Sequence, residues 1–381
     1  MSGNSLRDVD LDIRSVRVRY AGRMVGTLAL TAGGVLAFEY DDDWVGEGFS
    51  ISPFSLPLEK RVFVAARHPL DGVFGVFDDS LPDGWGRLLV DRLLRSHGVD
   101  PFAVSPIVRL AIVGPGGMGA LEYVPEMPLA SPATSTDFDE LAQECANVLA
   151  ADGSQDLDTL FAMGGSSGGA RPKVLTRIDG DDWIVKFASS RDDRDIGESE
   201  YRYALAAKAC GIDMPEVRLF PSKRCSGYFG VRRFDRIPAA SGAVRKVHMV
   251  SAGALLETSH RVPNLDYEIL MRLTLRLTDS FEDVERLYRL MCFNVLAGNR
   301  DDHAKNFSYL YDESRAVWTL SPAYDLTRNG GMNSEHATTV CGKGKHIGMD
   351  DLLSVGVKAG LSKPRARAIA DEVRQVTAGL R

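Results

Sequence analysis

The stretch NRDDHAKNFSYL, residues 299–310, followed by SPAYD, residues 321–325, decides how the fold of this chain is interpreted. It brings Asp301, Asn306 and Asp325 into one short window. Carboxylate and amide oxygens are ligands that suit a hard cation such as Mg²⁺. We therefore expect these three side chains to form a magnesium site that serves the transfer of a phosphoryl group.

Spacing distinguishes two neighbouring aspartates in this stretch. Asp301 stands five residues before Asn306, in the order D-x-x-x-x-N that a kinase catalytic loop uses for its base and its magnesium-binding Asn. Asp302 stands only four residues before it, and Asp325 follows where the kinase scheme needs its other metal-binding carboxylate. A hydrophilic turn with Asx capping would show the same pattern, because short matches of this kind are common by chance.

A buried helix and a hairpin are predicted to frame this motif. Apolar residues recur on one helical face before it, at Val284, Leu287, Tyr288, Met291 and Val295. Gly298 ends that helix, and FSYLY and AVWTL flank residues 312–314 as a hairpin. No other histidine stands at metal-ligand spacing from His303. We interpret His303 as shaping the loop or touching a nucleotide.

The segment MGGSSGGARPKVL, residues 163–175, is rich in glycine. Its four glycines allow positive φ and a close approach of the backbone to phosphates, and Arg171 and Lys173 add positive charge. A mobile surface loop would have the same composition. The segment therefore becomes informative only together with the elements that follow it.

Two later segments fit a nucleotide site. In WIVKF, Lys186 stands inside an apolar strand, where a lysine is costly to bury unless it is paired, and Glu200 on the next predicted helix is a candidate partner. In GYFGVRRFDRI, the alternating strand from Gly227 leads to Arg232–Phe234, where a hinge could place backbone groups against adenine. An edge-strand lysine in solvent and an ordinary strand are the simpler readings.

The first part of the chain predicts a small sheet without clustered chemical side chains. Val16, Val18 and Tyr20 alternate with arginines, and VGTLAL and VLAFEY follow after turns, which indicates a β-meander. LPDGWGRLLVDRLLRSHG predicts a helix with an apolar stripe that ends near Gly98. VGPGGMGALEYV lacks the ending of a phosphate loop, so we predict a hairpin turn there.

Composition and charge exclude several classes of protein. The chain has 381 residues, 44% hydrophobic and 25% charged, which fits a folded protein with a sizeable core. Its net charge of −7 argues against a globally basic nucleic-acid binder. Five scattered cysteines show no metal-ligand pairs, and no apolar run is long enough for a signal core or a membrane span. We expect a cytoplasmic protein in a reducing compartment.

Taken in order, several segments resemble a known family. They are GGARPK, WIVKF, ESEYRYALAAKACGIDMPE, VRRFDR, GNRDDHAKNFS and SPAYDL, together with LPDGWGR and GPGGMGALEY near the amino terminus. This set is similar to the HipA-like serine/threonine kinase toxins of bacterial type II toxin–antitoxin systems. The resemblance covers nearly the whole chain, and DDHAKNFS with the downstream YDL is its most specific part.

The resemblance implies an α+β, two-lobed protein-kinase-like fold with a small β-rich N-terminal subdomain. We place that subdomain at residues 10–124, a proline-rich linker at 125–135, the kinase N-lobe at 136–237 and the helical C-lobe at 238–381. A helix near Asp137, with Leu141, Cys145 and Leu149 spaced by four, opens the N-lobe.

The resemblance also implies roles for individual residues. Asp301 would be the catalytic base, with Lys186 as the second catalytic residue, and Asn306 and Asp325 would bind Mg²⁺. The nucleotide loop would include Ala170, Arg171 and Lys173. ATP would further contact the remaining predicted residues, which are Lys186, Arg232, Arg233, Phe234 and His303.

Family members autophosphorylate a serine in the glycine-rich loop, and here this chain departs from the pattern. Alignment on Lys173 puts Gly168 where one commonly used serine would stand. Ser166 and Ser167 lie just before it, with Ser166 preferred for autophosphorylation. Arg232 also stands where a well-known member carries a glutamate, so adenine contacts there would come from the backbone.

The resemblance implies partners as well as chemistry. It implies a HipB-like helix-turn-helix antitoxin, contact with operator DNA indirectly through that antitoxin, and a protein substrate in translation such as an aminoacyl-tRNA synthetase. Two alternatives remain open from the residues. One is a small-molecule kinase of the aminoglycoside or choline type, and the other is an ATP-binding pseudokinase that acts as an interaction module.

Overall fold

The computed structural model describes residues 11–127, 137–150, 157–166, 168–238 and 244–380. Its contacts divide the chain into two compact units. Unit 1 comprises residues 1–198 and 218–248, and unit 2 comprises residues 199–217 and 249–381. Most of the proline-rich segment at 125–135 lies outside the described residues, so the predicted domain limits stay a prediction.

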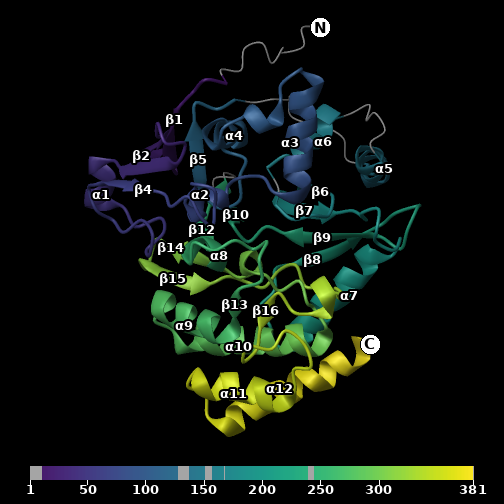
Figure 1. Cartoon of the computed structure of the whole chain (residues 1–381). Coiled ribbons are helices and arrows are strands. Elements are labelled where there is room, and N and C mark those ends of the chain that lie inside the picture. The colour runs from purple at the N-terminus through teal and green to yellow at the C-terminus, as the bar shows by residue number, and fades with distance from the viewer. Residues whose placement is uncertain (1–10, 128–136, 151–156, 167, 239–243, 381) are drawn as a thin grey trace. The chain divides into compact units, whose positions relative to one another are not determined.

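The N-terminal part of unit 1 is a five-stranded antiparallel sheet in the order β4-β3-β2-β1-β5 (Figure 1). Its first three strands confirm the predicted meander, because Val16, Val18 and Tyr20 are buried while their neighbours are exposed. The strands are β1 (Ser15–Tyr20), β2 (Arg23–Leu30), β3 (Leu36–Tyr40), β4 (Val62–Val64) and β5 (Leu121–Val124).

An aromatic cluster fills the core of this sheet. The Tyr20 ring lies edge-on to Trp44 and Phe49, with centroids 5.7 and 5.3 Å away. Trp44 comes from the short helix α1 (Asp42–Glu47), whose first turn is capped by the Asp41 carboxylate. Such rings bury roughly 150–250 Å² each, so they supply much of the stability of this region.

Helices cover the same part of unit 1 and include one difference from expectation. The predicted helix is α3 (Gly84–Ser96), with Trp85, Leu89 and Leu93 buried. The turn at VGPGGMGALEYV joins helix α4 (Pro106–Val113) to β5, so the predicted hairpin turn is wrong. Ser105 caps α4 with Pro106 in its first turn, and these signals outweigh the strand-like apolar run IVRLAIV.

A second sheet of unit 1 carries the glycine-rich segment. Its strand order is β6-β7-β9-β8. The strands are β6 (Lys173–Ile178), β7 (Asp181–Lys186), β8 (Val217–Phe220) and β9 (Tyr228–Arg232). The remaining elements of unit 1 are α2 (Gly75–Asp78), a 3-10 turn (Pro101–Ala103), α5 (Phe138–Leu149), α6 (Leu157–Gly164), β10 (Arg236–Pro238) and β11 (Val244–Lys246). Helix α5 confirms the helix predicted near Asp137, whose side chain caps it.

Unit 2 is mainly helical, and Figure 1 shows α11 and α12, in yellow, lying beside α10. The helical face predicted before the motif is confirmed in α10, where Val284, Leu287, Tyr288 and Met291 are buried. The helices that lie wholly in unit 2 are α8 (Ala252–Leu255), α9 (Tyr267–Thr278), α10 (Phe281–Ala297), α11 (Met349–Lys358) and α12 (Lys363–Thr377), with 3-10 turns at Ala304–Asn306, Met332–Ser334 and Ala378–Leu380. Helix α7 (Ile196–Ala209) belongs to this unit from Ser199 onward.

Short strands of unit 2 hold the segments around the motif. The predicted hairpin is confirmed as β14 (Ser308–Asp312) and β15 (Val317–Leu320), and β12 (Met249–Ser251) pairs with β14. The parallel pair β13 (Leu265–Asp266) and β16 (Thr338–Thr339) brings the segment after the hairpin beside the start of α9. This arrangement places residues from both sides of the motif around its loop.

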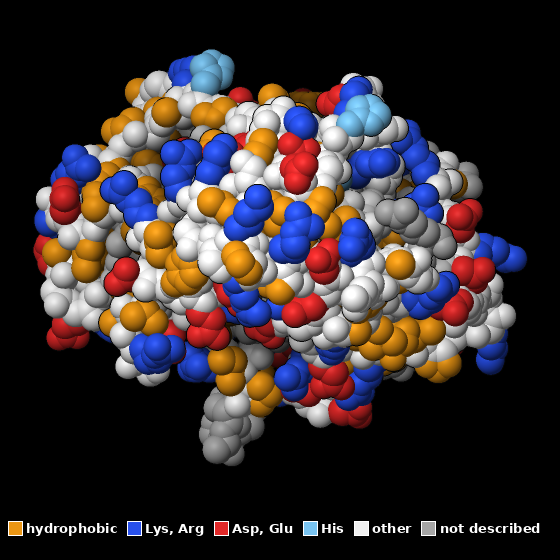
Figure 2. Space-filling model, turned by 90° about the horizontal axis from the view of Figure 1, so that it is seen from below, with side chains coloured by type: hydrophobic (Ala, Val, Ile, Leu, Met, Phe, Trp, Pro, Cys, Tyr) orange, Lys and Arg blue, Asp and Glu red, His pale blue; other side chains and the backbone are white. Residues whose placement is uncertain are grey.

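The exposed surface mixes charges of both signs. On the face in Figure 2, Lys and Arg side chains alternate with Asp and Glu and with scattered hydrophobic groups. Several helices of unit 2 carry such pairs, for example Arg365 with Glu285 and Lys358 with Glu268. Within the part of the chain that the structure describes, no helix combines the length and the apolar character needed to cross a membrane.

Candidate active site

The motif loop of unit 2 begins where α10 stops. Gly298 adopts a left-handed conformation with φ of 73° and donates its N–H to the Asn294 carbonyl, which closes the helix as predicted. The loop then passes through Asp301 and Asp302 into the 3-10 turn Ala304–Asn306. We call residues 299–306 the motif loop. A loop between a buried helix and a hairpin presents side chains from a rigid support.

Two of the predicted residues are joined within this loop. The side-chain nitrogen of Asn306 donates to the backbone carbonyl of Asp301 over 2.6 Å. Both side chains are half-buried. This bond orients the Asn306 amide through its nitrogen, and the amide oxygen is the atom that suits a hard cation.

Asp325 is brought to the motif loop by its neighbour. The Tyr324 hydroxyl donates to the Lys305 carbonyl over 2.6 Å and shares a hydrogen bond with the Ser308 hydroxyl. Asp325 itself has a φ of 58°, in the left-handed region that non-glycine residues rarely adopt. Residues in such conformations cluster at functional sites. The segment that carries Asp325 is thus bonded to the loop that carries Asp301 and Asn306, and carboxylate and amide oxygens are a donor set that fits Mg²⁺.

Burial separates the two aspartates that spacing alone had to distinguish. Asp301 is half-buried, whereas Asp302 is 0% exposed. His303 is half-buried, its Nδ1 accepts the N–H of Lys305 over 3.3 Å, and its ring lies 5.4 Å from that of His260. These contacts fit the interpretation that His303 shapes the loop.

In unit 1 the glycine-rich loop rests on the start of α3. The Asp83 carboxylate accepts the N–H of Gly169, and the Gly169 carbonyl accepts the N–H of Trp85 over 2.8 Å. The Trp85 indole donates to the Lys173 carbonyl over 3.1 Å. A Cβ at Gly84 would lie 2.3 Å from the Gly169 carbonyl oxygen, so only glycine allows this approach.

Two lysines of this unit stand directly opposite each other. Lys173 on β6 pairs with Lys186 on β7, and each is only 8% exposed. Opposed residues of an antiparallel pair have their side chains on the same face, so the two ammonium groups concentrate positive charge there. The Lys173 amine also donates to the Gly168 carbonyl of the glycine-rich loop. This face suits a polyanion such as a nucleoside triphosphate.

Other predicted nucleotide residues have structural partners. Arg171 makes a two-pronged contact with Asp192, at 3.0 and 2.9 Å. Burial acts to raise the pKa of Asp192, but hydrogen bonds from Arg171 and Ser189 outweigh it and lower that pKa below its usual value. Ala170 is exposed beside these groups. The predicted role of Arg171 in binding nucleotide stays a prediction, since its guanidinium is already engaged.

The predicted hinge contains residues of different kinds. Arg232 is exposed and lies 3.4 Å from Asp181, and Phe234 is half-buried. Arg233 is 7% exposed and its guanidinium pairs with Asp235 over 2.7 Å, while its N–H bonds to the Asp182 carbonyl. A nucleotide contact at Arg233 would therefore come from its carbonyl oxygen. Glu200, the proposed partner of Lys186, is 2% exposed on α7.

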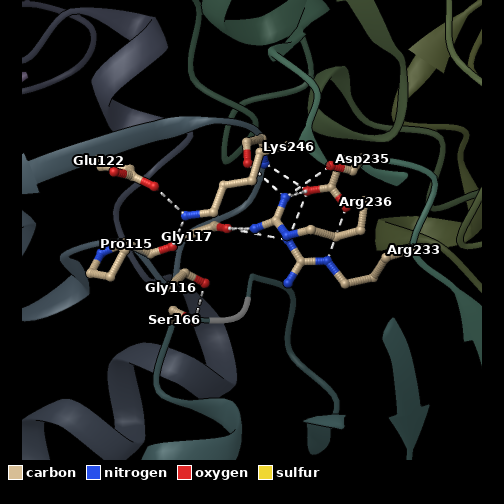
Figure 3. Close-up of polar contacts among 10 residues, drawn as sticks. Pro115, Gly116, Gly117, Glu122, Ser166, Arg233, Asp235, Arg236 and Lys246 are labelled. Carbon is tan, nitrogen blue, oxygen red and sulfur yellow. Dashed lines mark hydrogen bonds and ion pairs between the residues drawn. The ribbon is translucent and has the colours of Figure 1, made fainter. Parts of the chain in front are cut away.

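Sequence reasoning missed a cluster that fastens the turn at residues 115–119 (Figure 3). The Asp235 carboxylate binds Arg233 and Arg236 and accepts the N–H of Gly119 over 2.8 Å. Arg233 and Arg236 donate to the Gly117 carbonyl over 3.2 and 2.8 Å. We call Arg233, Asp235 and Arg236 the arginine cluster. The sequence VRRFDRI held these charges, but nothing local identified their partner 116 residues earlier.

The same turn holds one of the predicted phosphorylation sites. The Ser166 hydroxyl donates to the Gly116 carbonyl over 2.9 Å, and Lys246 donates to the Pro115 carbonyl over 2.6 Å (Figure 3). Ser166 is therefore engaged with the turn in this conformation. Ser167, the alternative site, lies outside the described residues.

A cavity of about 340 Å³ lies beside Lys186 in unit 1. Its walls are mostly apolar and come from α5, the end of β7 and the start of α7, with Phe187 and Tyr228 among them. Among the described residues, no group of three or more His, Cys, Asp or Glu side chains could hold a metal ion. A cation at Asn306 and Asp325 would thus take its remaining ligands from phosphate and water.

Comparison with known proteins places most of the chain in one family. The model of the HipA-like C-terminal domain matches residues 165–380, and that of the HipA N-terminal domain matches residues 16–124. This chain belongs to the HipA family. Both the glycine-rich loop and the motif loop fall within the C-terminal match, while Asp83, Trp85 and the turn at 115–119 fall within the N-terminal one.

Relatives and a solved structure agree with the HipA assignment. Two Sinorhizobium fredii proteins, named "Putative kinase Y4mE" and "Putative kinase Y4dM", are 27% and 26% identical to this chain. These alignments cover 83% and 81% of the chain and 77% and 76% of the relatives. The fold matches HipA of Shewanella oneidensis, solved with HipB and operator DNA, at a TM-score of 0.70 and 20% identity. That match covers 96% of this chain and 90% of the other.

Proposed function

We propose that this HipA-family chain is an ATP-dependent serine/threonine protein kinase and the toxin of a toxin–antitoxin pair. One observation carries the proposal most directly. Asn306 is bonded to the Asp301 backbone, and the hydroxyl of Tyr324, the residue before Asp325, is bonded to the Lys305 carbonyl of the same loop, which supports a shared site for the three predicted groups. The opposed lysines of unit 1 and the names of the two relatives support the same activity.

The roles follow from the chemistry of each group. Asp301 would accept or align the proton of the attacking hydroxyl, and Lys173 and Lys186 would hold the phosphates by charge. Asn306 and Asp325 would hold Mg²⁺, which when bound neutralises charge on the phosphates. Most of the rate acceleration would come from positioning and electrostatics, because the protein takes little covalent part in phosphoryl transfer.

The partners of the proposed toxin are inferred from relatives. HipA of Shewanella oneidensis was solved with HipB and operator DNA, which supports a HipB-like helix-turn-helix antitoxin for this chain and DNA contact through it. The substrate would be a serine or threonine of a protein in translation, such as an aminoacyl-tRNA synthetase. Growth arrest on expression, relieved by the product of a neighbouring helix-turn-helix gene, is the expected cellular result.

The enzymatic test compares aspartates that differ only in place. Asp301→Asn and Asp325→Asn should each lower the rate of phosphate transfer from labelled ATP to protein by about 10³-fold or more, because a base or a metal ligand is lost. Asp350→Asn, an exposed aspartate of α11 in the same unit, is the matched control and should keep full activity. Circular dichroism checks that all three variants fold.

Three results would count against the proposal. Near-normal transfer by folded Asp301→Asn contradicts the assigned base. Transfer to an aminoglycoside or choline panel, with none to protein, indicates the small-molecule kinase instead. A rise in melting temperature with Mg-ATP but no transfer to either class of acceptor indicates the pseudokinase, since ligand binding alone stabilises the folded state.

Autophosphorylation is a separate part of the proposal. We expect mass spectrometry after incubation with Mg-ATP to find phosphate on Ser166 or Ser167, with Ser166 preferred. A phosphate group on Ser166 would remove the hydroxyl proton that now binds the Gly116 carbonyl, so this contact must break. An active kinase with neither serine modified would reject this part alone.

A further inference from the structure

Asp302, the neighbour of the proposed base, has hydrogen-bond partners on both of its carboxylate oxygens. One of its oxygens, Oδ2, accepts the Tyr267 hydroxyl over 2.8 Å and lies 3.0 Å from Nδ1 of His336. The other, Oδ1, accepts the N–H groups of Ala337 and Thr338 over 2.9 and 3.3 Å. With 0% exposure, this side chain is out of reach of a substrate hydroxyl. Any effect of Asp302 on the reaction must therefore come through the position of the loop backbone.

The bonds of Asp302 continue into the helices behind the loop. The Tyr267 hydroxyl, on α9, accepts a hydrogen bond from the Asn294 side chain of α10 over 2.9 Å. The Asn294 side-chain oxygen in turn accepts the Asn299 amide over 3.0 Å. All of these side chains are at most 2% exposed. Burial, and then the Asp302 carboxylate, raise the pKa of Tyr267, so the phenol stays a donor.

The same loop is bonded to the segment that follows Asp325. Asn329 donates its N–H to the Gly298 carbonyl over 3.3 Å, and Ala337 donates to the Arg300 carbonyl over 3.1 Å. The Thr338 hydroxyl donates to the backbone carbonyl of Asp302. The chain after Asp325 is thus attached on both sides of Asp301. A shift of Asp302 would move the base and this segment together.

We propose that Asp302 is the positioning residue of the motif loop, which fixes Asp301 and Asn306 on either side of it through buried hydrogen bonds. This inference rests on the proposed kinase function and adds a role for the second aspartate. A carboxylate is needed because each of its oxygens faces two nitrogen or hydroxyl groups. An amide would turn one acceptor into a donor that faces other donors.

Asp302→Asn should therefore lower kcat by about 100-fold, the cost of misplacing catalytic groups by about 1 Å. The KM for ATP should change less than about three-fold, because Lys173 and Lys186, which are proposed to hold the phosphates, are not bonded to Asp302. Since this variant could fail to fold, Tyr267→Phe provides the milder test. It removes one donor to Asp302 and keeps the ring, and it should lower kcat by about ten-fold.

Tyr309→Phe is the matched control for Tyr267→Phe. Tyr309 is also fully buried in unit 2, and its hydroxyl binds the side chain of Thr274 at 2.7 Å rather than the motif loop. This variant also removes a buried tyrosine hydroxyl, one that bonds to an uncharged side chain, so it should lower stability without the loss of kcat. A merely structural role for Tyr267 would make the two variants alike.

Hydrogen exchange of the full chain without nucleotide gives a readout that does not need activity. Amides of residues 299–307 should exchange at least about five-fold faster in Tyr267→Phe than in Tyr309→Phe. Equal exchange in Tyr267→Phe and Tyr309→Phe overturns the inference. Equal kcat in these two variants also overturns it, provided that the wild-type chain is active. If the wild-type chain transfers no phosphate, the proposed function fails, and the exchange comparison alone decides whether Asp302 holds the loop.

Discussion

The two candidate loops of this molecule are supported in opposite ways. The glycine-rich loop of unit 1 is held by residues that lie about 50 to 86 positions earlier in the chain, within the HipA N-terminal match. The motif loop of unit 2 is held by the helices that directly precede it and the segment that follows it. The N-terminal region therefore belongs to the support of the glycine-rich loop and is more than an appended subdomain.

The chemistry of the two supports also differs. In unit 1 the turn at 115–119 is fastened by the arginine cluster, in which one buried carboxylate serves two guanidiniums. In unit 2 the support is a chain of hydrogen bonds among the uncharged side chains of Asn299, Asn294 and Tyr267, which ends on the Asp302 carboxylate. Breaking one partner of a buried ion pair costs more than losing one neutral hydrogen bond. The comparison thus predicts larger stability effects in unit 1.

The largest such effect should come from Asp235→Asn. Burial acts to raise the pKa of Asp235, but Arg233, Arg236 and the N–H of Gly119 together outweigh it and lower that pKa, so the carboxylate is charged at neutral pH. The substitution would leave two guanidiniums without their buried anion and should lower the stability of unit 1 by about 3–5 kcal/mol. Urea unfolding, followed by hydrogen exchange of peptides from each unit, measures this loss.

The control for this prediction is Asp181→Asn, which removes the partner of Arg232. That pair is 3.4 Å long and its side chains are 22% and 44% exposed. Exposed ion pairs contribute about 0–1 kcal/mol to stability, so the control should change the stability of unit 1 very little. Similar losses from both variants would show that the arginine cluster is not the main fastening of the turn.

The stability of unit 1 should depend on pH through His248, which contacts residues about 200 positions earlier in the chain. Its Nε2 lies 2.8 Å from the Ile51 carbonyl and its ring lies 5.5 Å from that of Phe49. Burial lowers the pKa of His248 from 6.5 to about 4. The unfolded chain therefore takes up the proton first as the pH falls. Stability is fully present above pH 6.5 and declines by up to about 3 kcal/mol toward pH 4.

His248→Gln removes this titration and should flatten the pH dependence of unit 1. His346→Gln, at an exposed position of unit 2, is the control and should keep the wild-type profile. Urea unfolding at pH 7 and pH 5, with each unit followed by hydrogen exchange, gives the comparison. An unchanged profile in His248→Gln would remove His248 from the support of unit 1.

The sequence alone predicted more of unit 2 than of unit 1, for a physical reason. In unit 2 the helix, the motif loop and the hairpin follow one another in the sequence. The apolar periodicity before Gly298 and the turn at residues 312–314 were therefore sufficient to predict these elements. Their roles in catalysis stay predictions. The choice of Asp301 over Asp302 rested on spacing, and the burial of Asp302 now gives it an independent basis.

In unit 1 the decisive contacts join residues far apart in the chain. The pairing of Lys173 with Lys186 depends on strand register, which the local pattern did not specify. The contact of Asp83 with Gly169 spans 86 positions. The predicted hairpin turn after Val113 was wrong because an apolar run alone cannot separate a strand from a buried helix. The Ser105-Pro106 start signal was present and would have indicated the helix.

The smallest effect tests whether Asp83 holds the glycine-rich loop from outside. Asp83→Ala removes a charge-assisted acceptor of the Gly169 N–H. The amides of residues 168–171 should therefore exchange about ten-fold faster, which corresponds to a loss of about 1.4 kcal/mol in the free energy of local opening. Asp100→Ala is the control, because this exposed carboxylate also accepts one backbone N–H, that of Phe102, away from the loop. Neither variant should alter exchange at residues 299–306. Faster exchange there in Asp83→Ala would mean that the two loops share one support, and the contrast between the units would not hold.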